Sequence, residues 1–416
     1  MLLALLAWSD LAYATNYNVR FCMNWTVDFG DVGGGDDFFT TNGARVARGT
    51  YWEVRNAADN SLLYSGYAVA SGTNEGCTPT TLPLNSSVDY DVLLYSKAYV
   101  NGNTIVVYDD TSTPSMYANQ MWSDWSPTAS TTVTADTSTV GDWVNVTAAA
   151  TTTIFRHNGG VTGKTFVVYD KGENGTLSGC QTHTTPNFGG SKLCGDEVFI
   201  TEAHASRKYL ISHEVAHLLA RYKDEDLAPN IDYDATDPPE CLYGGTGDHA
   251  MSSLEFQSAA AVEGWAHFIA AVTFNDTSES DCSFYYWKDV DWDADTLGDG
   301  SPKWVDCEYA SHCDNVDESC GPIVTHDHMG YECGLTTANR AVEYDWLRFW
   351  WDTHTDAGET FLSCMDVWDR ADPHDWLDVG TSPPADMPYA RIRKGADDED
   401  ILAGWDDRAD YEGVDR

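Results

Sequence analysis

Apolar and polar residues alternate along the first hundred residues of the chain, with Gly, Asn and Asp between the alternating stretches. A period of two places successive side chains on opposite faces of a strand, and turn residues between such stretches are typical of antiparallel β-structure. The expected strands cover residues 17–22, 50–55, 62–69 and 92–107. We therefore predict an N-terminal antiparallel β-sandwich over residues 15–125.

The pattern changes after residue 125. Residues 126–140 are rich in Ser and Thr and poor in large apolar side chains, which favours a linker between domains. Beyond it, periodicity predicts helices at 143–157 and 337–355 and strands at 164–169 and 197–201. The later helix is rich in Trp and indicates core packing rather than an aromatic substrate cleft. We expect a second domain at residues 141–395 and an acidic tail at 396–416, which makes the fold class α+β.

The first residues of the chain resemble an export signal. An apolar run from Met1 to Trp8 leads to Ala12-Tyr13-Ala14, the small-x-small pattern that signal peptidases accept. We expect residues 1–14 to be a signal peptide, with a buried N-terminal strand as the alternative. No other apolar run approaches the roughly 18 residues that span a bilayer, so membrane insertion is not expected.

Eleven cysteines agree with a secreted or cell-surface protein. None forms a CxxC pair, so disulfides explain them better than zinc-finger or iron–sulfur ligation does. Cys22 with Cys77 and Cys180 with Cys194 are the candidate bridges. The odd number of cysteines leaves one thiol unexplained.

The formal charge of -43, from 66 acidic and 23 basic residues, changes the set of expected partners. A phosphate backbone or an anionic membrane surface would repel such a chain, so nucleic acid is not expected to bind. Acidity of this kind favours solubility in a salty medium. A specific role with calcium or a cationic substrate is the alternative.

The strongest chemical signal is the sequence His213-Glu214-Val215-Ala216-His217, an HExxH motif inside a run of good helix formers. On a helix the two His side chains lie one turn apart on one face and can converge on one metal ion. Glu214 is then turned roughly 100° aside, where it can activate water instead of binding the metal. Apolar neighbours bury this helix, and burying two His and a Glu without a partner would cost several kcal/mol.

Zinc needs a third protein ligand, and no His or Gly follows His217 at the spacing of HExxHxxGxxH. Residues 259–271 form an apolar, small-residue helix with Glu263 and His267 four residues apart, and Glu263 is the expected third ligand. His267 and Glu255 are the alternatives, whereas Glu225 and Glu240 lie in expected loops.

HExxH followed by a glutamate on a second helix resembles the gluzincin group of metallopeptidases, to which the distantly similar thermolysin-like enzymes belong. The resemblance covers about residues 200–270 and implies a zincin-like catalytic domain. It also implies that His267, four residues after Glu263, supports a ligand histidine from outside the metal's ligand set. The separation of His217 and Glu263 exceeds that of the thermolysin-like enzymes, so an insertion lies between them.

The expected activity is that of a secreted zinc metalloendopeptidase that hydrolyses peptide bonds in peptide or protein substrates. Zinc polarises the carbonyl, and Glu214 takes the proton of the attacking water and passes it to the leaving amine. In gluzincins a Tyr or His beyond the third ligand stabilises the oxyanion. Tyr331 is the candidate for that catalytic role, with His326 and His328 as alternatives.

A second metal is suggested by alternating carboxylates before a glycine, an arrangement typical of Ca²⁺ loops. The candidate calcium ligands are Asp289, Asp291, Asp293, Asp295 and Asp299. A solvated acidic loop is the alternative, because the EF-hand spacing is not satisfied.

Two other functions are open at this stage. A secreted adhesin or binding protein would keep zinc and calcium only for structure, although such a site has no use for Glu214. A zinc hydrolase acting on another amide or an ester would have the same metal site. The sequence does not indicate the oligomeric state.

Overall fold

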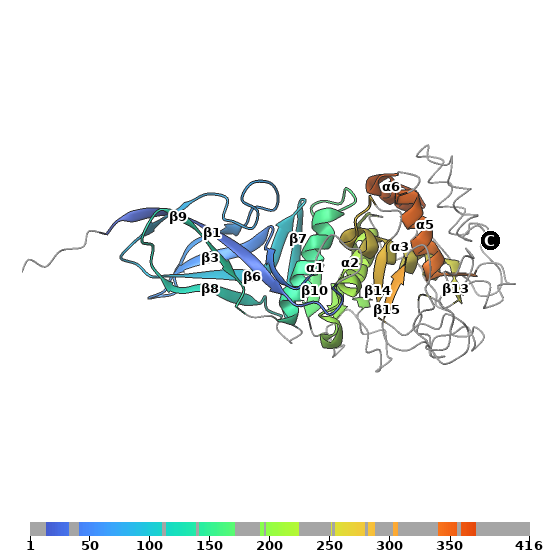
Figure 1. Cartoon of the computed structure of the whole chain (residues 1–416), viewed down its shortest axis with the longest axis horizontal. Coiled ribbons are helices and arrows are strands. Elements are labelled where there is room, and N and C mark those ends of the chain that lie inside the picture. The colour runs from blue at the N-terminus through green and yellow to red at the C-terminus, as the bar shows by residue number, and fades with distance from the viewer. Residues whose placement is uncertain are drawn as a thin grey trace, which may run out of the picture.

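The computed structural model describes residues 14–32, 41–109, 114–138, 141–170, 192–194, 197–223, 251, 254–278, 282–287, 303–306, 340–355 and 359–371. Helices and mixed sheets both make up a large part of these residues, which confirms the α+β class. Most strands lie towards one end of the molecule, and helices α1 (Asp142–Arg156), α2 (Lys208–Lys223), α3 (Gln257–Phe274) and α5 (Glu343–Thr355) follow towards the other end, with a few short strands beside them (Figure 1).

The described strands form two main sheets. The smaller sheet contains β1 (Asn16–Val27), β2 (Gly43–Val46), β5 (Leu82–Asn85) and β9 (Thr131–Asp136). The larger sheet has the order β11 (Lys192–Cys194), β12 (Glu197–Ile200), β10 (Thr165–Asp170), β7 (Asn103–Asp109), β6 (Tyr90–Val100), β3 (Thr50–Asn56) and β4 (Leu62–Tyr67), and β8 (Ala118–Trp125) also pairs with β6. Two short antiparallel pairs follow, β13 (Leu254–Phe256) with β16 (Arg340–Val342) and β14 (Ser283–Tyr286) with β15 (Lys303–Asp306).

The alternating stretch at 92–107 is two strands, not one. Asn101 and Gly102 both have positive φ, 47° and 80°, and connect β6 to β7 in a tight hairpin. Asn-Gly is favoured at such turns because both residues tolerate this conformation. The polar run from Asn101 to Thr104 interrupts the alternation and marks the turn that divides the expected strand.

Part of the segment expected to be a linker is a strand. Strand β9 lies within residues 126–140 and pairs in parallel with β1, from Val19 opposite Thr131 to Asn24 opposite Asp136. The expectation of a linker is wrong for these residues, and the smaller sheet is not purely antiparallel. The physical reason is that Thr is β-branched and suits a strand, although its polarity makes the segment resemble a linker.

The larger sheet combines strands from both sides of the predicted domain boundary. Strand β7 pairs in parallel with β10, from Thr104 opposite Thr165 to Asp109 opposite Asp170. Strand β12 then pairs in parallel with β10. Main-chain hydrogen bonding therefore continues from the N-terminal strands to the strands that precede the HExxH helix.

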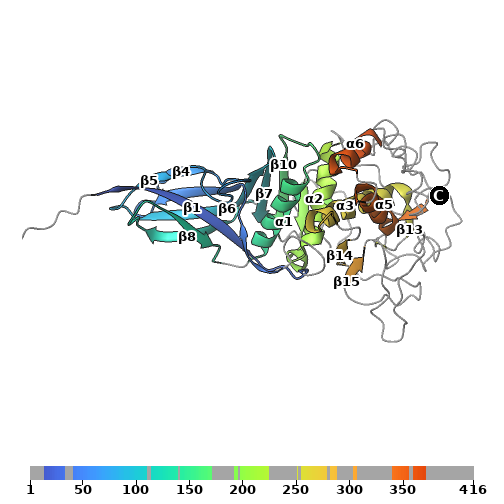
Figure 2. The same cartoon turned by 45° about the horizontal axis from the view of Figure 1, so that its top comes forward.

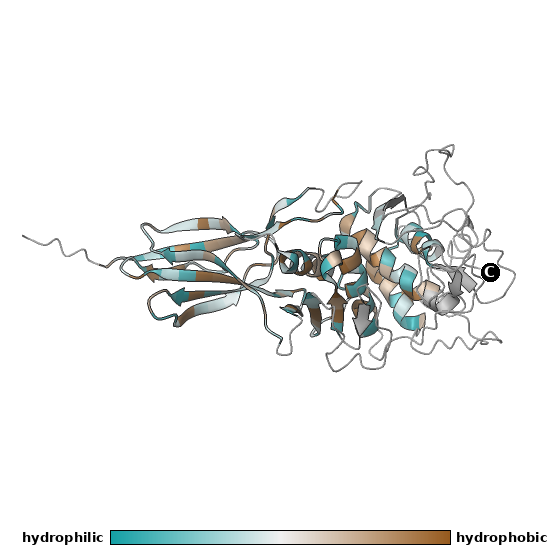
Figure 3. Cartoon of the chain, turned by 90° about the horizontal axis from the view of Figure 1, so that it is seen from below, coloured by the Kyte–Doolittle hydropathy of each residue, from teal (hydrophilic) through white to brown (hydrophobic). Residues whose placement is uncertain are grey.

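Among the described residues, a large hydrophobic core extends through the sheets and helices, and Tyr169 and Phe199 form a separate small cluster. Alternation along β1 points Phe21 and Trp25 inward, and Phe21 contacts Trp122 of β8 with ring centroids 5.0 Å apart. The smaller sheet thus packs on the larger one, and α1 (Asp142–Arg156) covers the same face farther along. The two kinds of element differ in their hydrophobic pattern. Hydrophobic residues alternate with polar ones along the strands and are grouped together along the packed helices (Figure 3).

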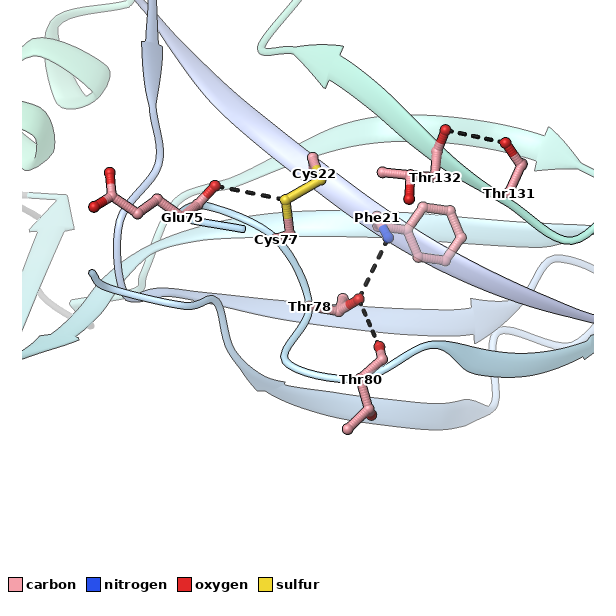
Figure 4. The surroundings of a disulfide bond; sticks show 8 residues. All are labelled: Phe21, Cys22, Glu75, Cys77, Thr78, Thr80, Thr131 and Thr132. Carbon is pink, nitrogen blue, oxygen red and sulfur yellow. Dashed lines mark hydrogen bonds between the residues drawn. A yellow bond between two sulfur atoms is a disulfide. The ribbon is translucent and has the colours of Figure 1, made fainter. Parts of the chain in front are cut away.

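The disulfide expected between Cys22 and Cys77 is present and joins β1 to the loop before β5 (Figure 4). Beside it, Thr78 accepts a hydrogen bond from the backbone N–H of Phe21 and donates one to the carbonyl of Thr80. Cys282 is also disulfide-bonded, and Cys364 on α6 (Phe361–Ala371) is a free, buried thiol. Cys180 lies outside the described residues, so the bridge expected between Cys180 and Cys194 stays a prediction.

The helices pack in succession away from the sheet. Helix α1 lies on α2 (Lys208–Lys223), α2 on α3 (Gln257–Phe274), and α3 on α5 (Glu343–Thr355), while α6 (Phe361–Ala371) contacts α2 and α5 (Figure 2). The Trp residues of α5 are fully buried, which confirms core packing for this helix; they are Trp346, Trp350 and Trp351.

No described helix has both the length and the hydrophobicity needed to cross a membrane. The predicted signal peptide (apart from Ala14) and the acidic tail lie outside the described residues.

Candidate metal centre

Helix α2 carries the HExxH motif, and its start is fixed by a residue distant in sequence. The carboxylate of Asp31 accepts hydrogen bonds from the backbone N–H groups of Lys208, at 3.0 Å, and Tyr209, at 3.2 Å. Asp31 therefore caps the N-terminus of the helix, where carboxylates are favoured. Burial raises the pKa of Asp31 to about 6, against the opposing effect of Lys208 and the two N–H donors. This cap connects the N-terminal strands to the helix with the two histidines.

Helix α3 lies against α2 and carries Glu263 and His267. Small side chains let two helices approach closely, and α3 contains many of them. Its fully buried alanines are Ala260, Ala261, Ala266, Ala270 and Ala271. The run of alanines that makes the segment helical thus also brings Glu263 towards α2.

The side chains of His213, His217 and Glu263 converge. Nε2 of His213 lies 3.0 Å from Oε2 of Glu263, and Nε2 of His217 lies 3.2 Å from the same oxygen. The two imidazole nitrogens are 3.1 Å apart. The three residues form a group that could hold a metal ion.

These separations fit a tetrahedral zinc ion. Zinc bonds to nitrogen and oxygen measure about 2.0–2.2 Å, so two ligand atoms on a tetrahedron lie roughly 3.3 Å apart. Two imidazole nitrogens and one carboxylate oxygen are also the donor types of catalytic zinc sites, which keep a fourth position open. Both the distances and the types of donor atom therefore agree with a zinc site.

The electrostatics of His213 favour the neutral form that binds metals. Burial lowers the pKa of His213 well below its ordinary value, and the neighbouring His267 and His217 act in the same direction. Glu263 acts in the opposite direction but does not outweigh burial. A neutral imidazole keeps a nitrogen lone pair available for a metal ion at mildly acidic pH.

Glu214 follows His213 on α2 and is 6% exposed. Its position in the helix turns it roughly 100° from His213, so it is adjacent to the three-residue group without belonging to it. The side chain of His217 is 11% exposed, compared with 3% for His213 and 5% for Glu263. The group is therefore most accessible on the side of His217.

His267 does not join the three-residue group. Its Nε2 lies 3.0 Å from Oε2 of Glu343, and its ring lies 4.3 Å from the ring of His213 between centroids. The geometry thus favours Glu263 over His267 as the third ligand. The other alternative, Glu255, belongs to β13, and its side chain lies outside the described residues.

Two residues near the centre are not singled out by the sequence. Glu343 begins α5 and is fully buried, and the ring of Trp287 lies 5.1 Å from that of His213. The sequence does not set Glu343 apart, because the same helix also carries Asp345 and Asp352. Trp287 stands in a Tyr-Tyr-Trp run with no distinguishing signal.

Several residues predicted for the site lie outside the described residues, and their roles stay predictions. They are the oxyanion candidates Tyr331, His326 and His328, and the candidate calcium ligands Asp289, Asp291, Asp293, Asp295 and Asp299.

Comparison with known proteins does not assign the chain to a group. No model of a known protein family matches the sequence, and no curated protein is significantly similar to it. The function of the candidate metal centre must therefore be argued from its own residues.

Proposed function

We propose that this protein is a secreted zinc metallopeptidase of the gluzincin type, in which His213, His217 and Glu263 bind the metal and Glu214 is the general base. The proposal includes a zincin-like arrangement of α2 and α3 and an N-terminal β-sandwich made by the two packed sheets. The observation that carries it is the convergence of three N and O donors at 3.0–3.2 Å from an HExxH helix and the next helix.

A zinc ion in this position would supply Lewis-acid activation of a water molecule and of the substrate carbonyl. Glu214 accepts the proton of the attacking water on its carboxylate and later donates it to the nitrogen of the leaving amine. The small exposure of His213 and Glu263 limits bulk water around them and strengthens their interactions with a cation. The more exposed His217 lies on the side from which a peptide would approach.

Glu214 distinguishes this function from that of a secreted binding protein with structural zinc. Closed structural sites use four protein ligands, whereas the described residues provide three. A buried carboxylate next to such a site has no purpose in a structural centre. Hydrolysis of another amide or of an ester would need the same residues, so the choice of peptide bonds rests on the resemblance in the motif.

The experiment that tests the proposal compares wild type, Glu214→Gln and Glu202→Gln for zinc content and for hydrolysis of casein. Glu202 is an exposed glutamate just before α2 and serves as the matched control. We expect Glu214→Gln to keep its zinc and lose about 10²–10⁴-fold in kcat, since it removes a general base. Glu202→Gln should match wild type.

Removal of the metal gives a second test. A chelator should abolish hydrolysis by wild type, and zinc should restore it. Glu263→Ala should no longer retain zinc after dialysis. Zinc binding without any hydrolysis of proteins or peptides would contradict the peptidase function, and a structural metal or a hydrolase of another bond would remain as explanations. A wild-type protein that binds no metal would contradict the metal site itself.

A further inference from the structure

A buried pair of charged and polar side chains lies behind the candidate ligands. Nε2 of His267, on α3, is 3.0 Å from Oε2 of Glu343, the first residue of α5. The side chains are 1% and 0% exposed. Burial of a carboxylate costs several kcal/mol unless it is paired, so the contact is a specific one.

This pair touches the metal centre through the ring of His267. That ring packs on His213 with centroids 4.3 Å apart and planes inclined by 37°. Trp287 contacts both rings, at 5.1 Å from His213 and 5.6 Å from His267. His213 therefore cannot turn without displacing a neighbouring ring.

The backbones of α3 and α5 are in close contact beside Glu263. A Cβ atom added to Gly264 would lie 2.3 Å from Cβ of Trp346 and 2.7 Å from the carbonyl oxygen of Glu343. Only glycine permits this approach. It places the start of α5 against the turn of α3 that carries Glu263 and, one turn later, His267.

We propose that Glu343 is a positioning residue of the metal centre, which holds His267 against His213 and thereby fixes the orientation of the first metal-binding imidazole. The inference rests on the metal-binding part of the proposed function. Glu343 accepts a hydrogen bond from the Nε2–H of His267, which fixes both the tautomer and the plane of that ring. Helix α5 is thus part of the metal site, although it contributes no ligand.

Groups that hydrogen-bond a metal ligand directly affect metal affinity by roughly 10–100-fold. Glu343 acts on His213 through the ring of His267, so we expect an effect near the lower end of this range. Two variants of similar volume separate the hydrogen bond from the charge. Glu343→Gln removes the charge and keeps an oxygen that accepts from His267, whereas Glu343→Met removes both. Asp352→Asn is the control, because it removes another buried carboxylate from the same helix.

The measurements are the zinc dissociation constant, from competition with a chromophoric chelator, and the visible absorption spectrum of the Co²⁺-substituted protein. Unfolding in urea establishes that each variant is folded. We expect Glu343→Met to weaken zinc binding at least tenfold and to change the Co²⁺ spectrum, because the geometry around the ion is altered. Glu343→Gln should stay within about threefold of wild type, and Asp352→Asn should not differ from it.

A folded Glu343→Met with the zinc affinity and Co²⁺ spectrum of wild type would overturn the inference. Equal weakening by Glu343→Met and Asp352→Asn would also overturn it, because the effect would then be general to the helix. Zinc affinity and the Co²⁺ spectrum can be measured even if the wild-type protein does not hydrolyse peptides. Failure of the inference about Glu343 is therefore distinguishable from failure of the proposed peptidase reaction.

Discussion

Gly264→Ala is a sharp test of the packing that supports the metal centre. The added Cβ would lie 2.3 Å from Cβ of Trp346, 2.7 Å from the carbonyl oxygen of Glu343 and 3.1 Å from the backbone nitrogen of Leu347. Ordinary contacts are 3.4–4 Å, so α3 and α5 would have to separate by roughly 1 Å. Two of these atoms belong to the backbone of α5, which a rotamer change cannot move.

The magnitude follows from two opposing effects. Overpacking of a core costs about 1–3 kcal/mol and more when backbone must move, whereas Ala in a helix is about 1 kcal/mol better than Gly. We expect a net loss of about 2 kcal/mol in the free energy of unfolding. The shift of α5 also pulls Glu343 from His267, so zinc should bind about 10–100-fold more weakly.

Urea unfolding monitored by Trp fluorescence, together with the zinc dissociation constant, provides the assay. Gly66→Ala in β4 is the control, because its Cβ would meet only side-chain atoms of Trp52, the nearest being Cζ2 at 3.3 Å. The control should change stability by less than about 1 kcal/mol and leave zinc affinity unchanged. A Gly264→Ala protein with the stability and zinc affinity of wild type would refute the close contact of α3 and α5.

The remaining predictions concern the elements that fix α2 and the smaller sheet. The folded state raises the pKa of Asp31 from 3.8 to about 6, so it retains a proton that the unfolded chain releases, and stability falls as pH rises through this window. Between pH 3.8 and about pH 6, the free energy of unfolding of wild type should fall by about 3 kcal/mol more than that of Asp31→Asn. Urea titrations of both proteins at each pH measure this difference. If wild type and Asp31→Asn showed the same dependence of stability on pH, the raised pKa of Asp31 would be refuted. Replacing Cys22 and Cys77 by Ser opens a loop of sequence separation 55 and should lower the free energy of unfolding by about 4 kcal/mol. A melting temperature close to that of wild type in a calorimetric scan would argue against a stabilising role of this disulfide.

Local patterns in the sequence predict much of the fold that supports the site. The helix of the HExxH motif occurs where the run of helix formers indicates it, and the Ala-rich helix occurs where periodicity does. The Trp-rich helix α5 also occurs, but it begins at Glu343, because residues 340–342 of the expected helix form β16. Periodicity succeeds because it reports which face of a segment is apolar, and that is a property of neighbouring residues. The same patterns do not reveal that β9 is a strand, since its partner β1 lies more than one hundred residues earlier.

The sequence by itself determined the pair of histidines, because residues four apart on a helix lie on one face. It also determined the place of Glu214 beside them and identified Glu263 as the candidate third ligand. The contact between Glu263 and His217, 46 residues apart, was decided by the packing of α3 on α2. The pairing of His267 with Glu343, 76 residues apart, was decided by the close approach of α5 at Gly264. Spacing along a chain fixes contacts only within one helix or strand, whereas contacts between elements depend on which buried surfaces fit together.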